Sequence, residues 1–157
     1  MSYWIDPYRC CGVDVTPYSV SFKAVKSATT QRTIAASDNN QEIVFDSVLW
    51  DAFGSAFASN RFTVPSAYDG RYMNFTAGVE TTVAATHDIY FEVSANEIDW
   101  TVIAVNGDLT ATVMTASTGP VLATAGNVFR VRYNLPGFAV DTFMNNTDKT
   151  FFSGYVT

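Results

Sequence analysis

The sequence predicts an all-β protein, an antiparallel sandwich of the jelly-roll type. Short runs rich in β-branched and aromatic residues follow one another, and turn residues separate them about every 8–12 positions. Aromatic residues make up 15% of the 157 residues, which favours strands over helices. Charged residues also make up only 15%, which argues against a coiled coil, a solvated helical bundle and a disordered chain.

Residues 1–19 differ from the remainder and predict an extended N-terminal arm. They show neither the two-residue period of a strand nor the 3.6-residue period of a helix, and they contain Pro7 and Pro17. The arm is too apolar for a solvated tail, so we expect it to dock against another surface. The side chains expected to dock are Tyr3, Trp4, Ile5 and Tyr8. Residues 20–157 are expected to form one all-β domain.

The first predicted strand covers residues 20–27, where Val20, Phe22 and Ala24 alternate with residues of the other face. Residues 49–57 have apolar side chains at helical spacing, but the flanking strands and a glycine favour a loop there. The other predicted strands are residues 42–51, 60–65, 71–80, 87–94, 100–105, 109–115, 120–124, 127–135 and 149–157.

Two turns and the core follow from the same pattern. Asn106-Gly107 lies between two β runs and is the strongest hairpin signal, because both residues tolerate positive φ. Residues 117–120 predict a second turn. Phenylalanines that alternate with polar neighbours are expected in the core. They are Phe22, Phe45, Phe62, Phe75, Phe91, Phe129 and Phe151.

Charge and cysteine content exclude several partners. The net charge of −6 repels phosphate backbones, and the nine basic residues are scattered, so we expect neither nucleic-acid nor membrane binding. No secretory leader is evident at the N-terminus. The adjacent Cys10 and Cys11 can bridge each other only in a strained ring, so we expect free thiols and synthesis in a reducing cytoplasm.

Catalytic, cofactor and metal motifs are not found in the sequence. His87 is the sole histidine, opens a predicted strand and has no nucleophile motif near it. Residues 37–42 are dense in oxygen ligands, which leaves a calcium site open, although they lack the spacing of a defined calcium loop. We therefore expect no enzyme activity, no cofactor, and no function that depends on His87, Cys10 or Cys11.

Four segments after residue 43 carry a family resemblance. They are Phe45-Asp46-Ser47-Val48, residues 60–75 with their Pro and Gly-x-Tyr spacing, residues 125–133, and the closing run at 150–156. In order and spacing they resemble the tumour-necrosis-factor-like jelly roll, in its complement globular-head branch. The gap from Pro65 to Gly70 is longer than usual, and no collagen-like Gly-x-y repeat precedes the domain.

The resemblance implies a non-catalytic homotrimer in which residues 20–27 and 150–157 pair on one sheet. Aromatic residues in loops and at strand ends are the best anchors for subunit contacts. The trimer-interface candidates are Trp50, Trp100, Phe138, Phe152 and Tyr155.

Domains similar to this class also recur in tailed-phage virions. We therefore expect a virion protein, made in the host cytoplasm, that is a homotrimeric capsid decoration or tail-associated protein. The arm at residues 1–19 is expected to attach it to the major capsid protein or another virion protein. The alternative is the receptor- or glycan-binding head of a phage fibre.

Overall fold

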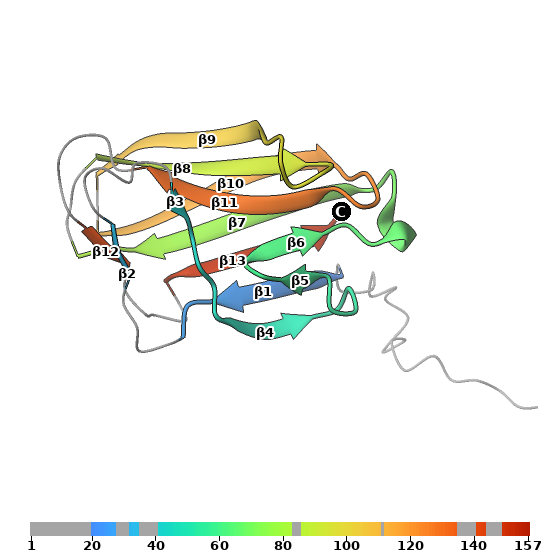
Figure 1. The fold of residues 1–157 in the computed structure, drawn as a ribbon, viewed down its shortest axis with the longest axis horizontal. Coiled ribbons are helices and arrows are strands. Elements are labelled where there is room, and N and C mark those ends of the chain that lie inside the picture. Colours follow the sequence, from blue (N-terminus) through green and yellow to red (C-terminus); the bar gives the residue numbers. More distant parts are fainter. Residues whose placement is uncertain are drawn as a thin grey trace, which may run out of the picture.

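A computed structural model describes residues 20–27, 32–34, 41–82, 86–110, 112–134, 141–143 and 149–157. They form two antiparallel sheets that pack face to face, so the predicted all-β sandwich is confirmed (Figure 1). One short 3-10 helix, Ser66–Tyr68, lies between two strands. Within the described residues, no helix is long and apolar enough to cross a membrane.

The first sheet has the strand order β10-β7-β13-β1-β4. The first and last strands of the domain are neighbours in it, as expected, and Phe22 of β1 lies opposite Gly154 of β13. Its strands are β1 (Ser21–Val25), β4 (Ser47–Asp51), β7 (Tyr72–Glu80), β10 (Val113–Leu122) and β13 (Phe151–Val156).

The second sheet has the order β5-β6-β11-β8-β9, and β3 also pairs with β11. A separate pair of short strands joins β12 (Asp141–Phe143) to β2 (Arg32–Ile34). The strands of the second sheet are β3 (Gln41–Glu42), β5 (Phe57–Ala58), β6 (Arg61–Thr63), β8 (Thr86–Ser94), β9 (Thr101–Thr110) and β11 (Val128–Asn134).

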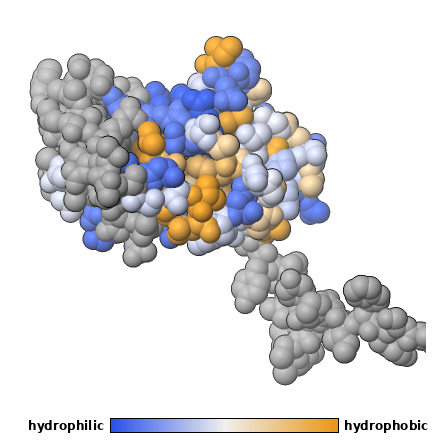
Figure 2. All heavy atoms as spheres, turned by 60° about the horizontal axis from the view of Figure 1, so that its bottom comes forward, coloured by the Kyte–Doolittle hydropathy of each residue, from blue (hydrophilic) through white to orange (hydrophobic). Residues whose placement is uncertain are grey.

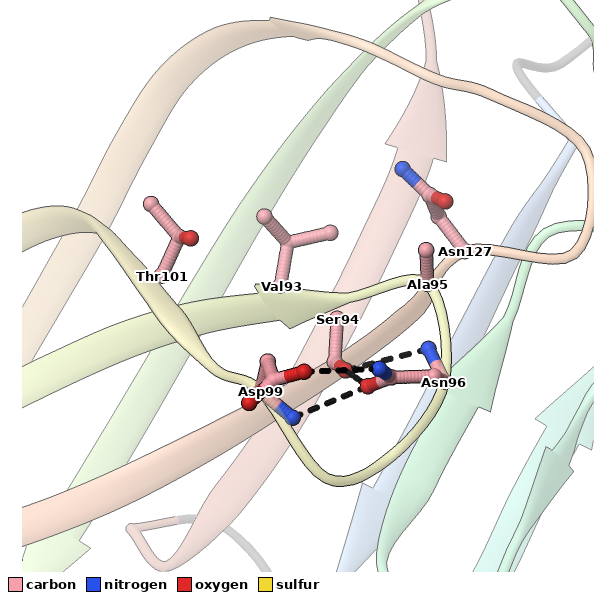
Figure 3. A pocket seen from close by; sticks show the side chains of 7 residues that line it. All are labelled: Val93, Ser94, Ala95, Asn96, Asp99, Thr101 and Asn127. Carbon is pink, nitrogen blue, oxygen red and sulfur yellow. Dashed lines mark hydrogen bonds between the residues drawn. The ribbon is translucent and has the colours of Figure 1, made fainter.

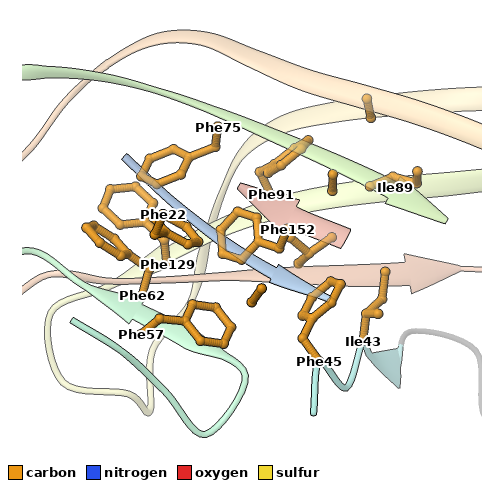
Figure 4. Packing of buried hydrophobic residues seen from close by; sticks show 14 of the residues in the cluster. Phe22, Ile43, Phe45, Phe57, Phe62, Phe75, Ile89, Phe91, Phe129 and Phe152 are labelled. Atoms are coloured by element: carbon orange, nitrogen blue, oxygen red, sulfur yellow. The ribbon is translucent and has the colours of Figure 1, made fainter. Parts of the chain in front are cut away.

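Phenylalanine rings fill the space between the sheets (Figure 4). Phe22 of the first sheet stacks on Phe62 of the second, with ring centroids 4.6 Å apart. Gly154 leaves room for the Phe22 and Phe75 rings, because a Cβ atom at this position would come within 2.7 Å of both. The core is therefore a close-packed aromatic layer that tolerates little change in volume.

The last strand is shifted by one residue from its predicted orientation. Phe151 was expected in the core and Phe152 at the trimer interface, but Phe152 is fully buried and Phe151 is half-buried. The register explains this, since Phe152 lies opposite Ala24 and Ala77, which both face the core. Alternation along a strand fixes which residues share a face, but two adjacent phenylalanines do not show which one points inward.

The predicted hairpin at Asn106-Gly107 is wrong. β9 passes through both residues and ends at Thr110, because it stays paired with β8. The register places Leu109 opposite His87 and Asn106 opposite Ile89, so two residues of β9 face one of β8 in a bulge. A Cβ atom at Gly107 would lie 2.9 Å from Oδ1 of Asp88, which gives this glycine a packing role.

The turn predicted at residues 117–120 is also a bulge, in the middle of β10. Ser117 pairs with Thr76 and Pro120 with Asn74, so two residues of β10 lie opposite Phe75. The Phe75 amide donates to Oγ1 of Thr118 at 3.1 Å, which replaces the interrupted ladder bond. Pro120 is compatible with this place because β10 is at the edge of its sheet.

The single strand expected at residues 42–51 is divided between the two sheets. β3 pairs with β11 in the second sheet, whereas β4 pairs with β1 in the first. The connecting residues bond to both sheets, since the Ile43 amide donates to the Val131 carbonyl and the Asp46 amide to the Val25 carbonyl. The loop expected at residues 49–57 contains the end of β4 and the start of β5.

Candidate interaction surfaces

The face of the first sheet that points away from the core carries an aromatic cluster. Tyr72 of β7 lies directly opposite Leu122 of β10. Tyr155 of β13 lies opposite Asn74, which is two residues after Tyr72 on the same face of β7, so Tyr155 is diagonal to Tyr72. Side chains on diagonal positions of neighbouring strands are within reach of aromatic groups. Tyr72, Leu122 and Tyr155 are each 42–55% exposed, and we call this surface the Tyr155 face.

The remainder of this sheet face carries few charges, and the one in its middle is Lys23, which lies opposite Ser153 with Nζ 4.9 Å from the Phe151 ring centroid. Register places Thr76 beside Ser117 and Ser153, which are all uncharged. At the far end of the face, Lys149 Nζ pairs with Glu80 Oε1 at 2.9 Å. A sheet face that combines exposed aromatic groups with few charges is typical of a protein–protein interface.

The edge strand β4 carries a second apolar surface. Val48, Leu49 and Trp50 are consecutive and each is 45–50% exposed, and we call them the β4 edge. The register shifts here, so Leu49 is the extra residue of a bulge opposite Lys23 and Ala24. Figure 2, which brings the β4 side forward, shows hydrophobic side chains gathered in the middle of this surface.

The free face of the second sheet is charged and internally paired. Glu92 is only 2% exposed, and its two oxygens accept from Arg130 Nε at 2.8 Å and Arg132 Nη2 at 2.6 Å. Arg61 binds both oxygens of Glu42 and also contacts Glu97 at 2.6 Å. These carboxylates raise the pKa of the Arg61 guanidinium, chiefly through the hydrogen bonds to Glu42.

Trp100 covers this charge network. Its ring centroid lies 3.7 Å from the Arg130 guanidinium carbon and 5.2 Å from that of Arg61. Beyond the network, burial and the neighbouring Asp88 carboxylate raise the pKa of Tyr90. Since these groups already have charged or aromatic partners, this part of the second sheet is a stabilising network and not a free binding surface.

The structure therefore brings together only part of the predicted interface. Trp50 and Tyr155 belong to the first sheet, Trp100 covers the second, and Phe152 is in the core. Phe138 and the arm residues Tyr3, Trp4, Ile5 and Tyr8 lie outside the described residues.

Sequence reasoning missed Tyr72 and Leu122. Tyr72 shares its strand face with Asn74 and Thr76, and an aromatic residue on a polar face was the signal that could have identified it.

A polar hollow of about 290 Å³ lies at the loop between β8 and β9 (Figure 3). Asn96 Oδ1 accepts from the amides of Ile98 and Asp99, and its Nδ2 donates to Asp99 Oδ2 at 2.9 Å. These bonds fix the loop. At the loop Ile98 is 79% exposed, the largest value among the exposed large hydrophobic residues described.

The residues considered for chemistry form no site in the described part of the chain. His87 lies in β8 opposite Leu109, while Cys10, Cys11 and residues 37–40 are outside the described residues. Among the described residues, no group of three or more His, Cys, Asp or Glu side chains is placed to hold a metal ion.

No protein-family model and no curated protein matches the chain. Solved structures do match. The globular domain of zebrafish complement 1qA has a TM-score of 0.57 at 12% identity, over 88% of this chain and 96% of that domain. Murine APRIL has a TM-score of 0.62 at 10% identity, over 87% of this chain and 98% of that one. Eiger TNF from S. frugiperda has a TM-score of 0.60 at 10% identity, over 88% and 92% of the two chains.

These likenesses define the fold class. The chain is a two-sheet sandwich of the tumour-necrosis-factor and complement C1q type, which confirms the jelly roll expected from the sequence. Folds of this class typically form trimers, and the matched domains are not enzymes.

Proposed function

We propose that the protein is a non-enzymatic structural protein that works as a homotrimer on a virion. The observation that carries the proposal is the Tyr155 face, where exposed aromatic side chains lie on a sheet surface whose charges are confined to Lys23 and the Glu80–Lys149 pair. Burying such a face against another copy removes apolar area from water, while Lys23 keeps the Phe151 and Trp50 rings as partners at 4.9 and 5.9 Å.

A ring of three copies needs two different surfaces, because contacts around a three-fold axis are heterologous. The β9 end of the second sheet supplies a second one, since Val102 and Val105, which lie opposite Glu92 and Tyr90, are also exposed there. The Tyr155 face of one copy packs against this end of the next copy in the proposed trimer.

Two arguments favour a virion: the composition of the arm, and the recurrence of similar domains in tailed-phage virions. Residues 1–19 combine Tyr3, Trp4, Ile5 and Tyr8 with two prolines, as an extended docking segment does. Three arms on one trimer bind together, and linkage of this kind raises avidity by factors of about 10²–10⁴. The partner is the major capsid protein or another virion protein, which places the protein on a capsid or a tail.

A trimer built on the Tyr155 face is expected to dissociate when that face becomes charged. Changing Tyr72 and Tyr155 together to glutamate should raise the concentration for half-dissociation about a hundredfold or more, because buried carboxylates lack partners. Sedimentation velocity over a dilution series measures this change. The control is Thr63→Glu, at an exposed position on the second sheet, and unchanged assembly of the double variant would contradict the proposed interface.

Deleting residues 1–19 is expected to separate attachment from trimer formation. The truncated chain should still sediment as a trimer, because the proposed subunit contacts lie in the sandwich, but it should no longer incorporate into particles. Quantifying the protein in purified particles tests this, with the full chain as the reference. Normal incorporation of the truncated chain would overturn the attachment role of the arm.

The second candidate function is the head of a phage fibre that binds a receptor or glycan. The loop between β8 and β9 favours it, because a fixed backbone presents the exposed Ile98 beside a polar hollow. Loss of host adsorption by an Ile98→Ser variant that still incorporates into particles would support this function over decoration.

A further inference from the structure

Three consecutive apolar side chains on an edge strand stay about half exposed, although Trp50 Nε1 donates to Ser21 Oγ at 3.2 Å and Lys23 lies over its ring. Val48, Leu49 and Trp50 make up the β4 edge, and β4 is the outermost strand of the first sheet. Its inner side pairs with β1, and no other described strand pairs with its outer side. Exposed apolar edge strands accept further strands, so proteins normally cover them.

The N-terminal arm joins the domain beside this edge. The Ala52 amide, directly after β4, donates to the Ser21 carbonyl at 3.0 Å, and Val20 is the first described residue before β1. The chain that precedes Val20 therefore starts one strand away from the outer side of β4.

Its length is sufficient to reach the β4 edge. Residues 7–19 span up to about 40 Å when extended. Reaching the outer side of β4 from the start of β1 means crossing two strand spacings, about 10 Å, and running along β4 covers about 17 Å.

The arm also has matching chemistry. Tyr3, Trp4 and Ile5 are three consecutive large apolar residues, as are Val48, Leu49 and Trp50. In a pair of strands, successive side chains alternate between the two faces of the sheet. Two paired runs of three apolar residues therefore place apolar side chains next to each other on both faces. Pro7, which follows Asp6, ends the pairing segment, and an added edge strand tolerates a proline there.

We propose that the β4 edge is the resting site of the arm, where residues 2–6 of the same chain add to the first sheet as a sixth strand. On the proposed function, the same side chains later bind the virion partner, and the β4 edge covers them until assembly. The inference goes beyond the trimer and virion proposals, since it concerns the free protein and requires no partner.

Hydrogen exchange on the full chain tests the resting site. Some β4 amides do not donate to β1. In the native chain these amides should exchange at least about tenfold more slowly than in a variant with Tyr3→Ser, Trp4→Ser and Ile5→Ser. Ile98→Ser, which removes a more exposed apolar residue elsewhere, is the matched control and should leave β4 exchange at the native rate. Equal β4 exchange in the native chain and the triple variant would overturn the proposal.

The reciprocal variant is Leu49→Asp, which changes an exposed residue. It should increase chymotrypsin cleavage after Tyr3, Trp4 and Tyr8 about tenfold, because the arm loses its site. A synthetic peptide of residues 1–12 should restore slow β4 exchange to the triple arm variant, and protection only at another surface would contradict the proposal. Sedimentation of the same samples reports the trimer separately, so the two proposals fail independently.

Discussion

Replacing Phe152 by alanine is expected to lower the free energy of unfolding by about 4 kcal/mol, a value typical of the loss of a buried phenylalanine ring. Phe152 is fully buried, and its ring centroid lies 5.1 Å from that of Phe22, 5.7 Å from Phe75 and 6.0 Å from Phe57. Several rings lose contacts at once, and the packed layer cannot collapse into the space. Urea unfolding of native and variant protein at one concentration measures the loss.

The neighbouring Phe151 is the matched control for this change. It is only half-buried and contacts Lys23, whose Nζ lies 4.9 Å from the ring centroid. Phe151→Ala should therefore cost about 1 kcal/mol, within the ordinary range for substitutions. If Phe152→Ala instead keeps native stability and dissociates the trimer, Phe152 is an interface residue and the described register of β13 is wrong.

Removing the Glu92 carboxylate is expected to have the second largest effect, a loss of about 3 kcal/mol. Glu92→Ala leaves Arg130 and Arg132 without their shared partner, and a buried ion pair that loses one member is strongly destabilised. The value is at the lower end of that range because the arginine side chains are 15% and 23% exposed and can gain water. Thermal unfolding of the variant, with the ellipticity of the sheet as the signal, measures it.

Glu80→Ala provides the comparison, because Glu80 also pairs with a cation across strands. Its partner Lys149 has a side chain that is 47% exposed, so this pair should contribute less than about 1 kcal/mol. If Glu92→Ala and Glu80→Ala lower the stability by similar amounts, the ion pairs of Glu92 contribute no more than an exposed surface pair, and the prediction for Glu92 is contradicted.

The sequence was sufficient to predict the sandwich and the pairing of its first and last strands. Runs in which apolar and polar residues alternate, such as residues 71–80, identify strands, because a strand in a sandwich buries only one of its two faces. The pairing of the first and last strands was expected from the family resemblance, which the closing run at 150–156 helps to carry. The chain reversals were harder to predict. Asn106-Gly107 and residues 117–120 are compatible with turns, but pairing with β8 and β7 keeps both segments within strands as bulges.

The candidate surfaces were predicted less well than the fold. Trp50 and Trp100 are at predicted strand ends and Tyr155 is in the predicted closing strand, yet the structure divides the three between two sheets. Long-range register decides this division, and local patterns do not contain it. The charge network had no local signal, because Glu42, Arg61 and Arg130 are far apart in sequence and meet only across β3, β6 and β11.

Sedimentation equilibrium of the native full chain at micromolar concentration tests the central claim most directly. A homotrimer predicts a mass three times the 17.2 kDa of the chain. The mass should persist on dilution until the Tyr155 face dissociates, and it should fall in the variant that carries glutamate at Tyr72 and Tyr155. A single species of 17.2 kDa at that concentration would contradict the account, because the exposed aromatic face of the first sheet would then have no second copy to cover it.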